Sequence, residues 1–206
     1  MSSDINQKRG SLVSLGKHEI EKYSSKLISR GLELLRIVEQ EQNITLFPVK
    51  VQGMYGYINK TGEMVIKPKF NRAFWFEESL AAVEITCKWG YIERTGEIVI
   101  KPQFDDAASF YEGLGCVKIG TKYGFIDKTG KIIIKPQFDV AIWFDKGLAW
   151  VKISGKWGCI DKTGKIVIIP QFDSIGPFRE GLAHIEIAGK VGYINKRGDY
   201  IWKPTS

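Results

Sequence analysis

The stretch that decides the fold reads Lys156-Trp157-Gly158-Cys159-Ile160-Asp161-Lys162-Thr163-Gly164-Lys165-Ile166-Val167-Ile168-Ile169-Pro170. Its landmarks recur along the chain at a fixed step of 34 residues. They are the glycine after the aromatic residue (Gly56, Gly90, Gly124, Gly158, Gly192), the turn glycine (Gly62, Gly96, Gly130, Gly164, Gly198) and the proline (Pro68, Pro102, Pro136, Pro170, Pro204). A constant period without insertions predicts a repeat architecture, in which each unit buries its faces against its neighbours.

Each unit is predicted to be a three-stranded antiparallel meander. In the copy that begins at Leu114, strands are expected at 115–119, 123–127 and 131–135, with Gly130 closing a hairpin in the left-handed conformation. Pro136 should end the third strand, because proline cannot donate to a strand ladder. Asp139 is then expected to cap a short helical turn. A helical repeat of the same period is disfavoured by the glycines and by β-branched runs.

Both faces of each meander are predicted to be apolar. One face should carry Val117, Ile119, Tyr123, Phe125, Ile132 and Ile134, and the other Cys116, Ile126 and Ile133. A sheet that is apolar on both sides must be covered on both sides. The sequence therefore predicts a mainly β repeat protein of five meanders, stacked either as an open array or as a propeller-like ring.

The first 45 residues follow a different pattern. Residues 1–17 are expected to be a flexible tail, residues 18–43 an amphipathic helix, and residues 46–206 the repeat domain. The apolar stripe of the helix comprises Ile20, Tyr23, Leu27, Leu34, Leu35 and Val38. Such a helix would either cover an open end of the array or dock onto a partner protein.

Composition favours a protein of the cytoplasm. No run of about 18 apolar residues is present, and the N-terminus lacks a basic start followed by an apolar core. We therefore expect neither a membrane span nor a secretory signal. Cys87, Cys116 and Cys159 are odd in number and lie in different columns of the repeat, which argues against a disulfide framework and a metal site. The formal net charge is +7, and most of the excess lies in the repeats.

The repeated columns resemble those of the WG-repeat family, also called the KWG repeat. The resemblance rests on Lys156-Trp157-Gly158, on Asp161-Lys162-Thr163-Gly164, and on Pro170-Gln171-Phe172-Asp173, and it covers about residues 46–204. It weakens in the last copy, where Val191 replaces the aromatic residue, and it does not cover the predicted helix. The resemblance implies an interaction module of the kind found mostly in bacterial proteins, without known catalysis and without a stated ligand.

Residues that break the repeat are candidates for binding. Trp75, Trp143, Trp150 and His184 share columns with residues of different size in other copies, which favours either a variable surface or local packing. The regular aromatic residues before each glycine are instead expected in the core.

Lysines form a second set of candidates. Lys88, Lys122, Lys156 and Lys190 lie in turns, and Lys101 and Lys135 lie near the predicted end of a strand. Together they could form a basic rim that binds phosphates or an acidic protein, or one that keeps the array soluble and discourages edge pairing.

Catalysis is not indicated. The sequence holds two histidines, His18 and His184, and no phosphate loop, H-E-x-x-H or G-x-S-x-G motif. We expect no catalytic residue, metal or cofactor, and therefore a non-enzymatic scaffold that binds another protein through the repeats, the helix or both. The alternatives are nucleic-acid binding through the lysines and glycan binding through the non-repeating tryptophans.

Overall fold

The computed structural model describes residues 26–33 and 45–204, which belong to two compact units, Met1–Ile44 and Thr45–Ser206. In the first unit, residues 26–33 form a helix whose side chains are all exposed, including Leu27, Ile28 and Leu32. The other stripe positions of the predicted helix, Ile20, Tyr23, Leu34, Leu35 and Val38, lie outside the described residues.

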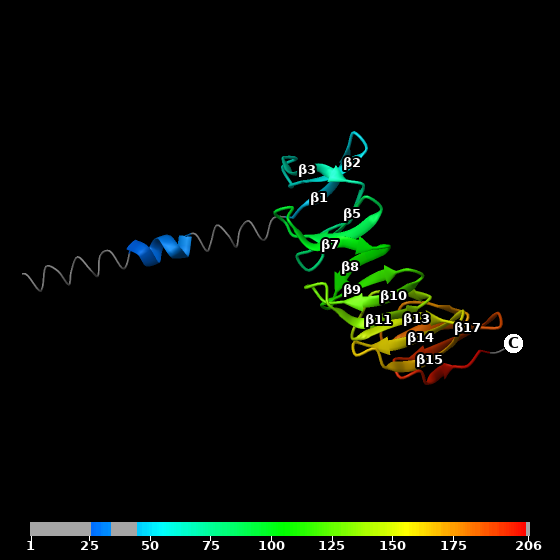
Figure 1. Ribbon diagram of the computed structural model, residues 1–206. Coiled ribbons are helices and arrows are strands. Elements are labelled where there is room, and N and C mark those ends of the chain that lie inside the picture. The colour runs from blue at the N-terminus through cyan, green and yellow to red at the C-terminus, as the bar shows by residue number, and fades with distance from the viewer. Residues whose placement is uncertain (1–25, 34–44, 205–206) are drawn as a thin grey trace, which may run out of the picture. The chain divides into compact units, whose positions relative to one another are not determined.

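The second unit consists of five antiparallel sheets in tandem (Figure 1). Sheet 1 contains β1 (Phe47–Val51), β2 (Met54–Ile58) and β3 (Met64–Phe70). Sheet 2 contains β4 (Arg72–Ala73), β5 (Ala81–Ile85), β6 (Lys88–Ile92) and β7 (Ile98–Phe104). Sheet 3 contains β8 (Asp106–Tyr111), β9 (Leu114–Ile119), β10 (Lys122–Ile126) and β11 (Ile132–Phe138). Sheet 4 contains β12 (Val140–Ala141), β13 (Leu148–Ile153), β14 (Lys156–Asp161) and β15 (Ile166–Phe172). Sheet 5 contains β16 (Ser174–Ile175), β17 (Leu182–Ile187), β18 (Lys190–Asn195) and β19 (Tyr200–Trp202).

The repeat fold is confirmed, and the array is open. Sheets 1 and 5 lie at opposite ends of the row in Figure 1, and no strand of one pairs with a strand of the other. The strand count is corrected, because sheets 2 to 5 each have four strands. The extra strand is the segment expected to be helical after Asp139: the Asp139 N–H donates to Lys152 O at 2.9 Å, and the Ile142 N–H donates to Trp150 O at 2.9 Å. Pairing with β13 satisfies these backbone groups, so no helical turn forms.

The third long strand of each sheet runs through its proline, which was expected to end it. β11 includes Pro136, and its register with β10 shifts there, so that Tyr123 faces Phe138 while Phe125 faces Ile134. Proline is tolerated because β11 is the outermost strand and the shift marks a bulge. The bulge brings backbone over the glycine of the repeat: a Cβ on Gly124 would lie 2.5 Å from Ile134 O and 2.7 Å from Pro136 N.

The hairpin turn after the second long strand forms as predicted. Gly130 has φ of +86°, and the Asp127 carboxylate accepts hydrogen bonds from the Thr129 N–H at 2.9 Å and the Lys131 N–H at 3.0 Å. A Cβ on Gly130 would also lie 3.2 Å from Ile100 of the preceding sheet. The turn therefore closes its own hairpin and rests on the neighbouring sheet.

The predicted division of side chains between the two faces was partly wrong. Cys116 pairs directly with Phe125 and belongs to its cluster, whereas Val117 belongs to the cluster of Ile126. Directly paired residues share a face, and the pairing register was not readable from the sequence. Ile119, Ile132 and Ile133 are exposed rather than buried.

The core lies between successive sheets. One face of sheet 1 contributes Leu46, Tyr57, Ile66 and Phe70, and the facing side of sheet 2 contributes Ala81, Val83 and Ile92. Phe76, from the segment that links the sheets, packs against the same cluster, with its ring 4.9 Å from that of Tyr57. We call the first side the forward face and the second the rear face. Each sheet up to the fourth thus has its forward face covered by the next rear face.

Candidate functional site

The turn lysines are engaged in ion pairs between neighbouring sheets. Lys88 lies 2.6 Å from the carboxylate of Asp105, and Lys122 and Lys156 pair in the same way with Asp139 and Asp173. The hydrogen bond from Lys88 lowers the pKa of Asp105. These three lysines are therefore partly neutralised where they lie.

The remaining candidate lysines are arranged differently. Lys101 and Lys135 are exposed in the middle of the outermost strands β7 and β11, because those strands continue past their prolines. Lys190 is exposed at the start of β18. Within residues 45–204, none of the three forms an ion pair. Lysine on an outermost strand discourages pairing with other chains, which accounts for two of them without a ligand.

The non-repeating tryptophans occupy two kinds of environment. Trp75 and Trp143 are about half exposed, and each makes an aromatic contact, with Phe47 at 5.6 Å and with Tyr111 at 5.6 Å. Trp150 is buried and stacks on Phe178 with ring centroids 5.3 Å apart.

Trp143 and Trp150 come together in a groove of about 330 Å³ at the boundary of sheets 4 and 5. We call it the Trp143 groove; its lining comprises Ile142, Trp143, Asp145, Leu148, Trp150, Ile175, Pro177 and Phe178. The buried indole Nε1–H of Trp150 finds no acceptor among the described residues. Trp75 does not belong to this groove. His184 lies half-buried on β17 with its ring 5.8 Å from that of Tyr193.

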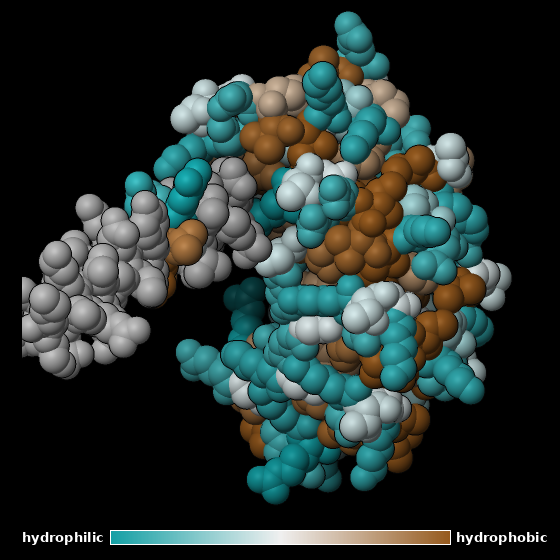
Figure 2. All heavy atoms as spheres, turned by 60° about the vertical axis from the view of Figure 1, so that its left-hand side comes forward, coloured by the Kyte–Doolittle hydropathy of each residue, from teal (hydrophilic) through white to brown (hydrophobic). Residues whose placement is uncertain are grey.

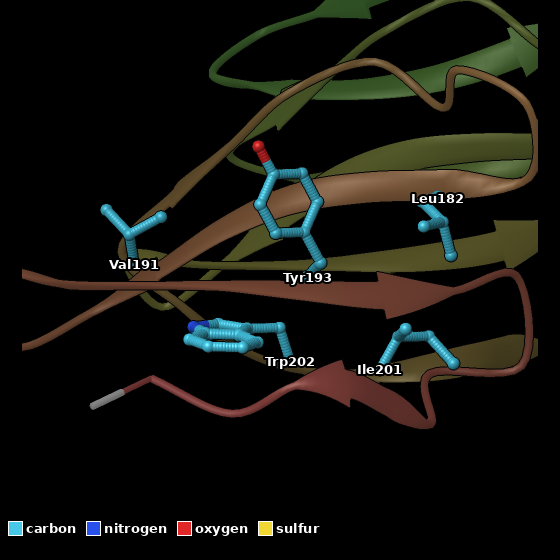
Figure 3. A pocket seen from close by; sticks show the side chains of 5 residues that line it. All are labelled: Leu182, Val191, Tyr193, Ile201 and Trp202. Atoms are coloured by element: carbon cyan, nitrogen blue, oxygen red, sulfur yellow. The ribbon is translucent and has the colours of Figure 1, made fainter.

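A hollow of about 560 Å³ lies on the forward face of sheet 5 (Figure 3). It is lined by Leu182, Val191, Tyr193, Ile201 and Trp202, which we call the end face. Figure 3 shows these side chains on three adjacent strands, β17, β18 and β19, with the Trp202 indole beside the Tyr193 ring. They form one continuous apolar surface with two aromatic residues.

Trp202 and Tyr193 of the end face stand in columns that are buried in the other sheets, whereas Ile201 stands in the exposed column of Val65, Val99, Ile133 and Val167. Ile66, Ile100, Ile134 and Ile168 are 2–3% exposed, whereas Trp202 in the same column is 61% exposed. Tyr57, Tyr91 and Phe125 are fully buried, whereas Tyr193 is 43% exposed. The described residues place no sheet over this surface. It is also the forward face on which a further sheet would pack.

Sequence reasoning did not single out the end face, although the signal was present. Trp202 stands in a column of isoleucines and Val191 in a column of aromatic residues, so the last copy departs from the pattern at the interface. The predicted binding residues included His184 and Lys190 of the last sheet, but none of the five residues of the end face.

A second row of apolar side chains lies along the outermost strands. It consists of Met64, Val65, Ile98, Val99, Ile132, Ile133, Ile166 and Val167, each about 40% exposed. In Figure 2, apolar patches alternate with polar ones along the visible side of the repeats. Because polar residues interrupt it, this row is a weaker candidate for binding than the end face.

Metal-ligating side chains do not cluster in the described part of the chain. Within residues 26–33 and 45–204, no group of three His, Cys, Asp or Glu side chains is placed to hold a metal ion. Cys87 is exposed and Cys116 and Cys159 are buried, and all three are free thiols. Within the same ranges, no helix is long and apolar enough to cross a bilayer.

Comparison with known structures shows similarity of fold. Kluyveromyces lactis Hsv2 has a TM-score of 0.52 with 12% identity, over 78% of this chain and 60% of that one. The crystal structure of a eukaryotic initiation factor has a TM-score of 0.57 with 8% identity, over 79% of this chain and 52% of that one. The chain thus spans between half and three fifths of the length of these two proteins. The matched structures are β-propeller-like.

The sequence has no significant match among curated proteins. The profile of the WG containing repeat, in contrast, matches it four times in tandem, at residues 55–86, 89–123, 123–157 and 157–190. These matches span more than half of the chain and agree in period with the sheets of the structure. The chain belongs to the family of WG-containing repeat proteins.

Proposed function

We propose that this protein is a non-catalytic module that binds another protein, and that the end face is its principal contact surface. The proposal rests on one observation, the exposure of Tyr193 and Trp202 in sheet 5, in two columns that are buried in every preceding sheet. Exposed apolar patches rimmed by polar residues mark interaction sites, and tryptophan and tyrosine are enriched at the centres of protein interfaces.

The titratable groups support a non-catalytic role, because those with lowered pKa have structural partners. Hydrogen bonds from Lys88, Lys122 and Lys156 lower the pKa values of Asp105, Asp139 and Asp173, and a hydrogen bond from the Thr129 hydroxyl lowers that of Asp127. Structural ion pairs and turn caps account for such shifts. The free thiols Cys116 and Cys159 are consistent with our placing the protein in the cytoplasm.

The same contacts reduce the case for nucleic-acid binding. A basic rim would need unpaired lysines, and three of the six candidates already face carboxylates. Glycan binding through Trp75, Trp143 and Trp150 remains a prediction, although Trp150 is buried.

A capture experiment with matched variants tests the proposal. We expect the tagged wild-type chain to retain a protein from native lysate of the source organism, and Trp202→Ser to lose it. Trp143→Ser removes an indole of similar exposure from the Trp143 groove and should retain the partner. If only Trp143→Ser loses the captured protein, the contact surface is the Trp143 groove. If Trp202→Ser still retains the captured protein, the end face is excluded.

A further inference from the structure

We infer that the partner of the end face is the first sheet of a second copy of this chain, so that copies associate head to tail. This inference rests on the proposed function, because it uses the same surface. It follows from comparing the internal interfaces between sheets with the two outer faces of the array.

The rear face of sheet 1 is the complementary half of an internal interface. It carries Phe47, Val49 and Ile58, all partly exposed. Val49 and Ile58 stand in the columns of Val83 and Ile92, which are fully buried against sheet 1. Sheet 1 therefore presents the apolar surface that internal rear faces present to a forward face.

The two outer faces also carry aromatic rings. The interface between sheets 1 and 2 contains four, from Tyr55, Tyr57, Phe70 and the linking residue Phe76. The last copy has Val191 in the column of Tyr55. In the sequence, the last copy has Ser206 in the column of Phe70, and no linking phenylalanine precedes Phe47 at the spacing of Phe76.

Two substitutions replace part of what is missing. Trp202 replaces an isoleucine of the forward column, and Phe47 replaces the alanine or glycine of the rear column. Tyr193, Trp202 and Phe47 would thus place three rings between the outer faces, where the internal interface has four. Phe47 already contacts Trp75 of its own chain, with ring centroids 5.6 Å apart. Swaps that conserve volume are those that packed interfaces tolerate best.

An ion pair of the internal interfaces supports the same pairing. Glu78 of sheet 2 binds Lys128 of sheet 3 at 3.1 Å, and Glu112 of sheet 3 binds Lys162 of sheet 4 at 2.9 Å. The next position in the column is Lys146, and no ion pair forms there within the described residues.

The outer faces carry the two halves of a further such pair. Glu180 of sheet 5 occupies the column of Glu78 and Glu112, and Lys60 of sheet 1 occupies the column of Lys128 and Lys162. Both are exposed, and neither forms an ion pair within residues 45–204. Docking of sheet 5 on sheet 1 of another copy would bring these opposite charges to the same place as in the internal interfaces. Charge complementarity of this kind selects the partner and the register of an interface.

Head-to-tail association predicts a specific pattern of complementation. We expect the full chain to form oligomers whose mass rises with concentration in analytical ultracentrifugation, because a heterologous interface leaves one free face at each end. Trp202→Glu should block the forward end, and Val49→Glu should block the rear end, so each variant alone should be monomeric. An equimolar mixture retains one intact interface and should form dimers and nothing larger.

Charge exchange tests the register without altering the apolar faces. Glu180→Lys or Lys60→Glu alone should raise the dissociation constant several-fold, and a mixture of the two should recover part of the loss, less so at high salt. Trp143→Ser is the control that should associate like the wild type. Circular dichroism confirms that each variant is folded.

Each remaining outcome overturns the inference. A wild-type chain that is monomeric at all concentrations excludes self-association. If Trp202→Glu abolishes association while Val49→Glu does not, end faces pair with each other rather than with sheet 1. If the chain is monomeric but still captures another protein through Trp202, the proposed function holds and only the inference that the partner is a second copy is wrong.

Discussion

At the residue scale, the repeat is defined by a close approach between backbones. The glycine after each aromatic residue makes room for the third long strand, whose carbonyl lies 2.4–2.5 Å from the position of an added Cβ at Gly56, Gly90, Gly124 and Gly158. The aromatic residue beside it is packed and not a binding platform: Trp89 is buried, and Lys152 lies over the ring of Trp157 at 5.7 Å.

Gly124→Ala should destabilise the array strongly. The new Cβ would meet Ile134 O and Pro136 N, both backbone atoms that cannot move without breaking the bulge. Overpacking of this kind costs about 3 kcal/mol of unfolding free energy. Gly176→Ala is the matched control, because its Cβ would meet only ordinary contacts at 3.4 Å or more. Urea denaturation of the two variants measures the difference, and equal midpoints would contradict the role assigned to Gly124.

The turn aspartates should make the free energy of unfolding depend on pH in the acid range. Hydrogen bonds from Thr129 and Thr163 lower the pKa values of Asp127 and Asp161 in the folded state. The unfolded carboxyl has a pKa of about 3.9. The stabilisation is therefore complete above that value, and it is lost as the pH falls through the lower folded pKa.

Replacing both aspartates by asparagine tests this assignment. Asn59 and Asn195 make the same turn in the first and last copies, accepting the Thr61 N–H at 3.0 Å and the Arg197 N–H at 2.9 Å. The double variant Asp127→Asn, Asp161→Asn should keep its fold and lose less stability than the wild type between about pH 4 and pH 2. Denaturant midpoints measured across that pH range give the stability of each protein. If the midpoints of the variant and the wild type fall equally with pH, these two carboxyls do not cause the acid dependence.

At the element scale, the sequence predicted the long strands well and the linking segments poorly. Repetition and alternation located the three long strands of every copy, and Gly130 identified its turn. The structure of two segments was predicted wrongly, because it depends on pairing with strands that are distant in the sequence. Residues 140–141 become a strand because β13 offers unpaired groups. Pro136 stays within β11 because β11 is an outermost strand with a bulge at that point. The candidate site was missed for a related reason, because Trp202 is notable only once its column is known to be an interface.

Each linking phenylalanine should hold two sheets together. Phe144 is buried and lies 4.8 Å from the ring of Phe125 in the preceding sheet. Phe144→Ala should cost about 3–5 kcal/mol in unfolding free energy, as expected for loss of a buried phenylalanine. Its neighbour Trp143 is half exposed, so Trp143→Ala should cost much less. Thermal unfolding of both variants compares them, and similar losses would show that the linking segment acts as one unit.

At the scale of the whole array, the stability of each sheet should fall from the middle of the array toward its ends. Sheets 2 to 4 are covered on both faces, whereas sheets 1 and 5 each have one face without a described neighbour. In repeat proteins, stability is close to a sum of unit and nearest-neighbour terms.

Native-state hydrogen exchange should reveal this gradient. In dilute protein, where copies do not associate, amides of β18 should exchange faster than those of β10. At high concentration, association should slow exchange in β18 and β2 and leave β10 unchanged. Uniform protection at every concentration would contradict both the gradient and the proposed contact.

The turns that rest on the preceding sheet leave little freedom in most of each copy, because a change there disturbs two sheets. The column of Trp75, Ser109, Trp143 and Pro177 is not a turn of this kind: it lies in the linking segment of three copies and in β8 of sheet 3, and it carries three kinds of side chain in four copies. A combinatorial library could therefore be built by varying one position per copy, with the scaffold unchanged. Such a library would place four side chains at regular intervals, and lengthening the array would add one more for each copy.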